Sequence, residues 1–306
     1  MKAPVISVVI PTFNGELYLD ALLNAVESQR IDAEVEVLVV DSGSTDATLD
    51  IVARHPAVRL VTIPNSEFSH GGTRQLAAAI SRGQLIAYLT QDAIPVADDW
   101  LAELAAPFAA SDRVALVTGR QHPRPTAFPL QKYEIIGSFA ALGPADGTSW
   151  ADGAADADSD HERDGFHSDV NAMVRRDFVL GSIPFRDVAY SEDMMMARDV
   201  LDAAFIKAYA GRAVVEHSND LDPAEYSRRI FDEVVGMRRI GTPLAPLSRR
   251  RALARSVRGS LGDSRRIVLD DDYSLAHKLR WLVVNPRFHF RKWSSYRRAT
   301  GVDSMR

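Results

Sequence analysis

Near its start the chain carries an apolar run that ends in small and polar residues, Val5-Ile6-Ser7-Val8-Val9-Ile10-Pro11-Thr12-Phe13-Asn14-Gly15. Residues 5–10 of this run predict a buried strand. Residues 16–28 follow, and their leucines and valine recur at the spacing of a helix face that packs on a sheet. The same strand–loop–helix order repeats over the first 120 residues. It predicts an α/β fold with a mostly parallel central sheet flanked by helices.

The repeat can be followed segment by segment. Further strands are expected at residues 35–40, 58–63, 85–89 and 114–118. Ser44, Thr45 or Asp46 can cap the helix after the second strand, and this helix is expected to turn Leu49 and Val52 inward. Other helices are expected at residues 72–81 and after residues 98–99.

The rest of the chain divides into three stretches. Residues 144–167 are rich in Gly and Asp and predict a surface loop or lid. A helix is expected at 190–202 and two short strands at 205–210 and 213–216. From residue 223 the chain is predicted to be mostly helical, with interruptions at Pro243, Pro246 and Pro286. We therefore expect a catalytic domain at 1–220, made of halves 1–120 and 121–220, and a helical extension at 221–306.

Composition excludes several kinds of chemistry. The 306 residues contain no cysteine, which rules out disulfides, cysteine-bound zinc and a thiol nucleophile. No stretch approaches the roughly 20 apolar residues that cross a bilayer. We expect a cytoplasmic protein, either soluble or bound at the inner face of the cytoplasmic membrane. The net charge is −5, yet residues 221–306 hold 19 Lys and Arg against 9 Asp and Glu. The extension is therefore basic and the remainder acidic.

Small and polar residues follow each of the first four strands. In a mostly parallel sheet these loops meet at the carboxyl edge, where open α/β folds bind ligands. Asp41 can accept a hydrogen bond from a base or ribose there, although the neighbouring residues also suit a helix cap. Asp92 suits Mg²⁺ or Mn²⁺, which take oxygen ligands, and its alternative is a turn aspartate.

Three other positions could carry chemistry. Glu192 and Asp193 open a predicted helix, where carboxylates are often only partners of the helix dipole. A group transfer to a hydroxyl needs one base to take the hydroxyl proton, and Asp193 is our candidate, with Glu192 as an acceptor ligand. His217 ends a strand and is either structural or a metal ligand. Arg74, beside two glycines at a helix start, is a weak candidate for a diphosphate contact.

Taken together, the motifs at these positions resemble those of family 2 glycosyltransferases with the GT-A (nucleotide-diphospho-sugar transferase) fold, and within them the rhamnosyltransferase-like branch. The resemblance covers roughly residues 4–240. Its specificity lies in the order and spacing of seven motifs at residues 8–14, 39–46, 68–74, 89–93, 119–121, 191–193 and 216–218.

The resemblance implies a role for each site residue. The nucleotide sugar would contact Pro11, Thr12, Phe13, Asn14, Asp41, Ser42, Arg74 and Gln91. The metal, Mg²⁺ or Mn²⁺, would be held by Asp92, as the last carboxylate of an Asp-x-Asp motif, and by His217. Glu192 and Arg120 would contact the acceptor, and Asp193 would be the catalytic base. Asp41, Asp92 and Asp193 should then lie around one diphosphate.

The chain departs from the family pattern at two positions. Thr90 stands where the commoner pattern has its first aspartate, which implies a weaker metal site. Asn219 follows His217-Ser218 in place of a second histidine, which leaves fewer nitrogen ligands.

The function implied is transfer of rhamnose or another deoxysugar from a dTDP, UDP or GDP donor to a glycan or lipid-linked glycan, as in cell-envelope polysaccharide biosynthesis. Metal and Arg74 would stabilise the leaving diphosphate while Asp193 deprotonates the acceptor hydroxyl.

Two other functions remain open at this stage. A sugar-nucleotide nucleotidyltransferase would need its glycine-rich loop after the first strand. A non-catalytic nucleotide-sugar-binding protein is favoured by Thr90 and opposed by Asp92 and Asp193. Nucleic-acid binding is disfavoured by the acidic body.

The basic, aromatic segment 275–298 suits either an anionic membrane surface or a packed helical subdomain.

Overall fold

The computed structural model describes residues 5–155, 165–188, 191–219, 221–239 and 241–301. Its strands are β1 (Val5–Thr12), β2 (Glu34–Asp41), β3 (Val58–Thr62), β4 (Leu85–Leu89), β5 (Ile94–Pro95), β6 (Val114–His122), β7 (Thr148–Asp152), β8 (Asn171–Arg175) and β9 (Ile206–Glu216). Its helices are α1 (Leu19–Glu27), α2 (Thr48–Ala53), α3 (His70–Ile80), α4 (Trp100–Ala105), α5 (Pro129–Leu142), α7 (Arg176–Leu180), α8 (Glu192–Asp202), α9 (Pro223–Arg239), α10 (Arg249–Leu269) and α11 (Leu275–Thr300). Two short 3₁₀ helices lie at η1 (Asn65–Glu67) and η2 (Ala106–Ala109).

The described residues fall into two compact units. One comprises Met1–His122 with Ser138–His217, and the other comprises Pro123–Gly137 with Ser218–Arg306. Residues 123–137, which we had included in the catalytic domain, thus group with the C-terminal helices.

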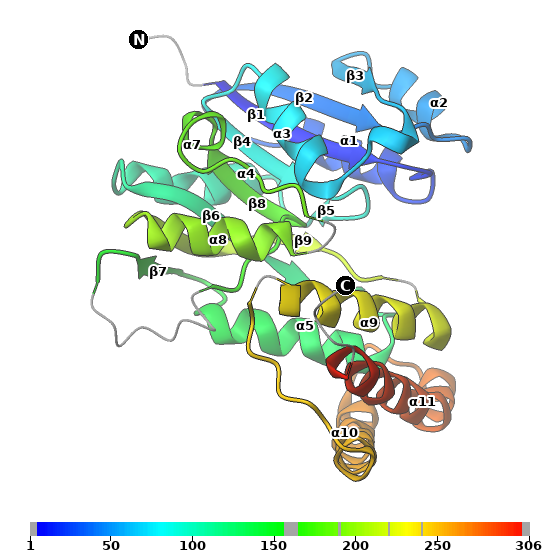
Figure 1. Ribbon diagram of the computed structural model, residues 1–306. Coiled ribbons are helices and arrows are strands. Elements are labelled where there is room, and N and C mark those ends of the chain that lie inside the picture. The colour runs from blue at the N-terminus through cyan, green and yellow to red at the C-terminus, as the bar shows by residue number, and fades with distance from the viewer. Residues whose placement is uncertain (1–4, 156–164, 189–190, 220, 240, 302–306) are drawn as a thin grey trace. The chain divides into compact units, whose positions relative to one another are not determined.

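The first unit is built on one mixed sheet, in which the described strands take the order β3-β2-β1-β4-β8-β6-β9-β5, with β7 paired to β9 (Figure 1). Strands β1 to β4 are mutually parallel, and β8 runs antiparallel to both β4 and β6. Strand β9 is parallel to β6. The carboxyl ends of β1, β2, β4, β6 and β9 therefore share an edge with the start of β8.

Helices cover both faces of this sheet. One core joins the sheet to α1, α2 and α4, and its α1 members are Leu19, Leu22, Leu23 and Val26, all at most 2% exposed. The other core joins the opposite face to α3, α7 and α8. These layers, which Figure 1 shows around the central arrows, confirm the α/β sheet predicted from the sequence.

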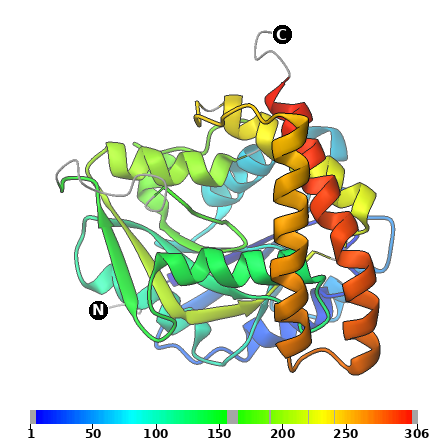
Figure 2. The same ribbon diagram turned by 90° about the horizontal axis from the view of Figure 1, so that it is seen from below.

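The second unit is helical. Its core contains aromatic residues of α9 and α11 together with Phe128, and the rings of Phe128 and Phe288 stack with centroids 4.2 Å apart. Helices α10 and α11 run side by side and are joined at one end by residues 270–274 (Figure 2). Trp281 and Phe288, which we had considered for a membrane surface, are buried in this core.

The prediction for α2 was confirmed at Val52, which is buried, and was wrong at Leu49. Leu49 is 37% exposed, whereas Thr48 is buried because its hydroxyl accepts a hydrogen bond from the Gly15 amide, 2.7 Å away. Ala47, not Ser44 or Thr45, occupies the N-cap, and Asp46 accepts from the Thr48 amide at 3.0 Å. The hydrogen bond between Thr48 and Gly15, a residue of the first loop, therefore helps to set which face of α2 is buried.

Two predictions about β9 and its partner were also wrong. The strands expected at 205–210 and 213–216 form one continuous strand, since the pairing register with β6 shifts beside Gly119 and absorbs the extra residues. The loop expected at 144–167 contains β7, an edge strand antiparallel to β9 that lacks an alternating apolar pattern. Residues 156–164 of that loop, and Tyr190 of the helix predicted at 190–202, lie outside the described residues.

Pro286 does not interrupt the last helix. It lies inside α11, which continues to Thr300. A proline in a helix removes one hydrogen bond and strains the preceding turn. The buried residues on both sides of it, Trp281 and Phe288, supply the packing that holds α11 together.

Candidate functional site

The site is built on the edge where the parallel strands end. Thr12 and Asp41 are the last residues of β1 and β2 and lie opposite each other in the sheet. Leu89 ends β4 opposite Asn171, the first residue of β8. His122 ends β6 opposite Glu216 of β9. The loops that follow or precede these residues therefore come together, although they are far apart in sequence.

Asp41 organises the first of these loops. Its carboxylate accepts hydrogen bonds from the amides of Gly43 and Ser44, both at 3.0 Å, from the Thr12 hydroxyl at 3.2 Å and from the Ser44 hydroxyl. Asp41 has no exposed surface, and Ser42 is 1% exposed. The side chain thus shapes the loop from within, and a direct contact between Asp41 and a nucleotide stays a prediction.

Asn14 ties the first loop to the second. It adopts a left-handed backbone with φ 50°, which asparagine tolerates better than most residues. Its side-chain oxygen accepts from the Thr45 amide at 2.8 Å, and its own amide donates to the Ser44 hydroxyl at 2.8 Å. Pro11 precedes this turn on β1, opposite Val40.

Gln91 joins the same loop to the segment after β4. Its amide group accepts from the Phe13 backbone N–H at 2.8 Å and donates to the Phe13 carbonyl at 3.1 Å. A Cβ at Gly15 would meet the Gln91 side-chain oxygen at 2.7 Å, so this contact requires glycine there. The Phe13 ring is 45% exposed and offers a flat apolar surface beside the edge.

Asp92 and His217 face each other across the edge, with 3.4 Å between the Asp92 carboxylate and His217 Nε2. His217 Nδ1 lies 3.1 Å from the side-chain oxygen of Gln121, whose amide nitrogen donates to Ser168 at 3.0 Å. Because that oxygen can only accept, Nδ1 carries the proton. Nε2 is then the ring nitrogen turned toward Asp92. A carboxylate and an imidazole nitrogen are both groups that can bind a divalent metal.

Asp92 and His217 together fit a divalent cation that takes most of its ligands from outside the protein. Across the described residues, no group of three or more His, Cys, Asp or Glu side chains could hold a metal. Mg²⁺ in particular is commonly bound by one or two carboxylates together with substrate phosphates. Thr90, at the position of the missing aspartate, has a buried hydroxyl that finds no hydrogen-bond partner in the described part of the chain. Asp92 and His217 could hold such a cation jointly with a diphosphate.

A second group of charges lies around Arg74, which is 6% exposed. Its guanidinium is 2.5 Å from the Glu192 carboxylate and 3.3 Å from that of Asp169. Although burial opposes ionisation, the nearby Arg74 holds the pKa of Asp169 below its usual value. The Arg74 guanidinium is therefore paired with two carboxylates of the protein itself. Its predicted contact with a diphosphate stays a prediction.

Asp169 and His167 belong to the same group of charges, and the sequence analysis did not single them out. His167 Nε2 lies 3.0 Å from Asp169 Oδ1, and His167 Nδ1 lies 2.6 Å from the Thr118 hydroxyl. Burial lowers the pKa of His167, which keeps the ring neutral at physiological pH. No motif marked these residues, because their partners Arg74 and Thr118 come from distant strands and helices.

Asp193 stands beside this cluster at the start of α8. The helix begins after Ser191, whose left-handed φ of 66° is unusual for a non-glycine residue. Asp193 is half-buried and accepts a hydrogen bond from the Met194 amide at 2.8 Å. Burial, followed by the negative charges of Asp169 and Glu192, raises the pKa of Asp193 to about 8. This carboxyl can take or release a proton near neutral pH.

Arg120 is the other residue predicted to contact the acceptor. It sits on β6, half-buried, and its Nε has no hydrogen-bond partner among the described residues. Its backbone carbonyl accepts from the Asn171 side chain at 3.0 Å. Glu192, predicted beside it as an acceptor ligand, is paired with Arg74 instead.

Contacts among the described residues thus link two groups at one edge. Asp41, Phe13 and Gln91 are joined through the first loop, and Asp92 follows Gln91 directly and reaches His217. His217 connects through Gln121 to Ser168, the neighbour of Asp169. Asp169 then leads to Arg74 and Glu192, beside Asp193.

Comparison with known proteins gives three findings. The family model "Glycosyl transferase family 2" matches residues 7–181. The chain is 32% identical over 230 residues to the O-antigen chain rhamnosyltransferase RfbN of Salmonella typhimurium, covering 74% of this chain and 70% of that one. It is 30% identical over 234 residues to the O-antigen chain rhamnosyltransferase WbaN of Salmonella anatum, covering 75% and 71%.

Among solved structures, the chain is similar to a mannosyltransferase from Pyrobaculum calidifontis in complex with GDP-Man and Mn²⁺. The TM-score is 0.61 at 18% identity, with 100% of this chain and 88% of that chain covered. This likeness confirms the predicted GT-A fold.

Proposed function

Because this chain belongs to glycosyltransferase family 2, we propose that it transfers rhamnose or another deoxysugar from a nucleotide-diphosphate donor to a glycan or lipid-linked glycan hydroxyl, with inversion. The similarity to two O-antigen chain rhamnosyltransferases supports this choice of sugar and acceptor. The observation that carries the mechanism is Asp193, a carboxyl whose pKa is raised to about 8 beside the buried Arg74 cluster.

The base assignment follows from what inversion requires. A single displacement at the anomeric carbon needs a proton acceptor for the attacking hydroxyl, and a general base works best with a pKa near the operating pH. Asp193 meets that condition because burial and two neighbouring carboxylates disfavour its ionised form. Glu192 and Asp169 then act by setting the proton affinity of Asp193 and by holding Arg74 in place.

On the donor side, the loops after β1, β2 and β4 would hold the nucleotide. Asp41, Thr12, Ser42 and Asn14 keep the first two loops in one conformation, and exposed Phe13 can lie against a base or ribose. Asp92 and His217 would hold Mg²⁺ or Mn²⁺, which supplies positive charge to the leaving diphosphate.

We also propose that the protein is cytoplasmic and contacts the inner face of the cytoplasmic membrane through the helical extension. No helix in the described part of the chain is long and apolar enough to span a membrane. Helices α10 and α11 nevertheless expose Leu261, Leu279, Val283 and Phe290, each more than half exposed, among many arginines. Exposed apolar and cationic side chains on one helix are typical of interfacial binding to anionic lipid. Vesicle sedimentation of Leu261→Ser/Val283→Ser tests this contact, and undiminished binding would oppose it.

The transfer reaction is tested with a panel of dTDP-, UDP- and GDP-sugars. We expect one donor to be hydrolysed or to raise the melting temperature in the presence of Mn²⁺, with dTDP-rhamnose as the first candidate. Asp193→Asn should keep the thermal shift and lose the hydrolysis. If no nucleotide sugar binds or reacts, the proposed donor is wrong.

A further inference from the structure

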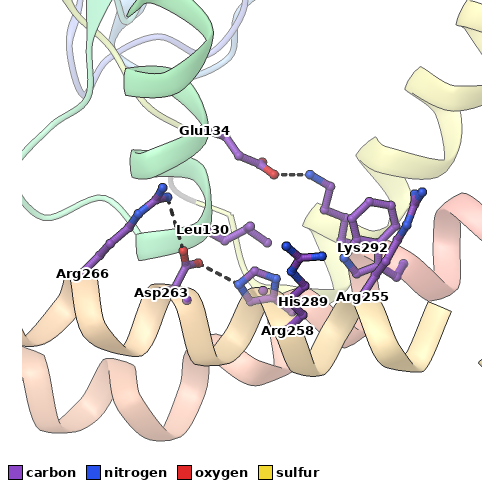
Figure 3. Close-up of a pocket in the computed structure, with 11 residues that line it drawn as sticks. Leu130, Glu134, Arg255, Arg258, Asp263, Arg266, His289 and Lys292 are labelled. Carbon is purple, nitrogen blue, oxygen red and sulfur yellow. Dashed lines mark hydrogen bonds and ion pairs between the residues drawn. The ribbon is translucent and has the colours of Figure 1, made fainter. Parts of the chain in front are cut away.

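The helical unit contains a pocket of about 400 Å³ between α5, α10 and α11, remote in sequence from the loops described above. Cationic side chains dominate its lining: Arg255, Arg258, Arg266 and Lys292, with His289 beside them. Two carboxylates, Glu134 and Asp263, also line it. Figure 3 shows Arg258 extending from α10 toward α5, past the His289 ring.

Both carboxylates of the pocket are engaged by protein groups. Glu134 pairs with Lys292. Asp263 accepts from His289 Nε2 at 2.7 Å and from the Asn285 amide at 3.2 Å, and it lies 3.7 Å from Arg266. These contacts hold the His289 ring in place. They also pair both carboxylates of the lining with groups of the protein.

Two arginines are left over. Within the described residues, neither Arg255 nor Arg258 makes an ion pair with a carboxylate. The Arg255 guanidinium instead lies 4.7 Å from the centre of the Trp293 ring, which orients it without neutralising it. The pocket therefore carries an excess of two guanidinium groups, each with a planar set of donors that suits phosphate oxygens.

Glycines keep the pocket open. A Cβ at Gly259 would meet His289 Nδ1 at 2.4 Å, so glycine is required for the ring to approach α10. A Cβ at Gly262 would meet nothing within 4 Å. Glycine inside a helix lowers its stability, and at Gly262 no packing contact requires it. The missing side chain leaves free space in the pocket.

We propose that this pocket binds a phosphate or diphosphate group. The two unpaired arginines supply positive charge that suits a phosphate monoester or a diphosphate. The cavity of about 400 Å³ also has room for a group larger than a single carboxylate. The same group could be presented by a lipid headgroup or by a soluble phosphate. The proposal does not depend on sugar transfer, since none of these residues belongs to the proposed catalytic site.

The test uses the full chain and inorganic pyrophosphate in isothermal titration calorimetry with EDTA present. We expect wild-type binding and a loss of about tenfold or more in affinity for Arg255→Gln/Arg258→Gln, because each removes a charged hydrogen-bond donor. The matched control is Arg250→Gln/Arg265→Gln, which removes two exposed arginines from the same helix outside the pocket. Its affinity should stay within about twofold of wild type.

A second variant addresses folding. Gly262→Glu adds a carboxylate where the backbone has room for a side chain, so the fold should persist, as its melting temperature would show. Pyrophosphate affinity should fall as much as in the double arginine variant. Equal affinities in wild type, pocket variants and control, or no binding to any of them, would overturn the proposal.

Sedimentation with phosphatidic acid vesicles distinguishes the two sources. A larger loss of vesicle binding in the pocket variant than in the control assigns a lipid phosphate to the pocket. Equal vesicle binding alongside pocket-specific pyrophosphate binding assigns a soluble phosphate.

Discussion

Replacing Asp193 with asparagine should remove activity while making the protein more stable, and the stability gain should depend on pH. Asparagine resembles the protonated carboxyl in size and cannot accept the acceptor's proton. Loss of a general base typically costs about 10²- to 10⁴-fold in turnover.

The magnitude of the stability change follows from the raised pKa of Asp193. The shift from 3.8 to about 8 spans four pH units, which would correspond to roughly 5 kcal/mol for a fully enclosed group. Asp193 is only half-buried, so solvent screening reduces the expected effect to about 2 kcal/mol. Between pH 4 and 8 the folded state holds a proton that the unfolded state releases, so wild-type stability falls as pH rises.

Urea denaturation at a series of pH values measures this effect. The stability difference between Asp193→Asn and wild type should be near zero at pH 4 and grow toward pH 8. Asp199→Asn is the matched control on the same helix, because Asp199 pairs with exposed Arg186 at 2.5 Å and has no part in the proposed chemistry. The control should retain activity and show no gain that rises with pH.

Either of two results would refute the reasoning. Turnover above about a tenth of wild type in Asp193→Asn would remove this residue as the base. A stability difference that does not grow with pH would show that Asp193 is ionised in the folded protein at neutral pH, contrary to its surroundings.

Three further changes test the neighbouring groups. Asp92→Asn should raise the Mn²⁺ concentration needed for half-maximal activity and reduce turnover roughly a hundredfold, as measured in a metal titration; unchanged metal dependence would place the cation elsewhere. Arg74→Met leaves two buried carboxylates unpaired and should destabilise the fold by about 3 kcal/mol or more at pH 7, seen in urea denaturation, with a smaller loss at pH 4. Glu192→Gln removes a negative charge beside Asp193, so the pKa of that base falls and the rising limb of the kcat/KM profile should move to lower pH. A higher acceptor KM with an unmoved profile would instead make Glu192 an acceptor ligand.

Local sequence predicted the layers of the fold because most strands and helices of the first 120 residues satisfy their own patterns. The four apolar residues of α1 are all buried, as their spacing required. Helix α5 was not predicted, although Pro129 at its first position is a usual helix start. It includes Gly137, and several of its contacts are with distant residues. The Leu130 amide donates to Asn285, and Lys132 pairs with Asp270. Those partners lie more than a hundred positions away, where no local pattern can reveal them.

The site shows the same division between local and distant information. Asp41, Asp92 and Asp193 were recognisable as candidates because each follows a strand or opens a helix in a recurring motif, and their roles stay predictions. Asp169 and His167 were not, since their importance arises only when β8 is inserted between β4 and β6. Pairing of Arg74 with Glu192 spans 118 positions and could not be inferred from either segment.

The charge balance around Arg74 is the physical reason for choosing Asp193 as the proposed base. One guanidinium faces the carboxylates of Asp169 and Glu192, with Asp193 nearby, and neutral His167 adds no positive charge. With all three acids ionised the cluster would carry a net negative charge in a largely buried place, which is unfavourable. Asp169 and Glu192 are in direct contact with Arg74, so burial and the excess of negative charge raise the pKa of Asp193, which makes no ion pair with another described residue. The unfavourable charge thus acts mainly on the ionised form of one carboxyl, Asp193. An aspartate with a pKa raised in this way can act as a base near neutral pH.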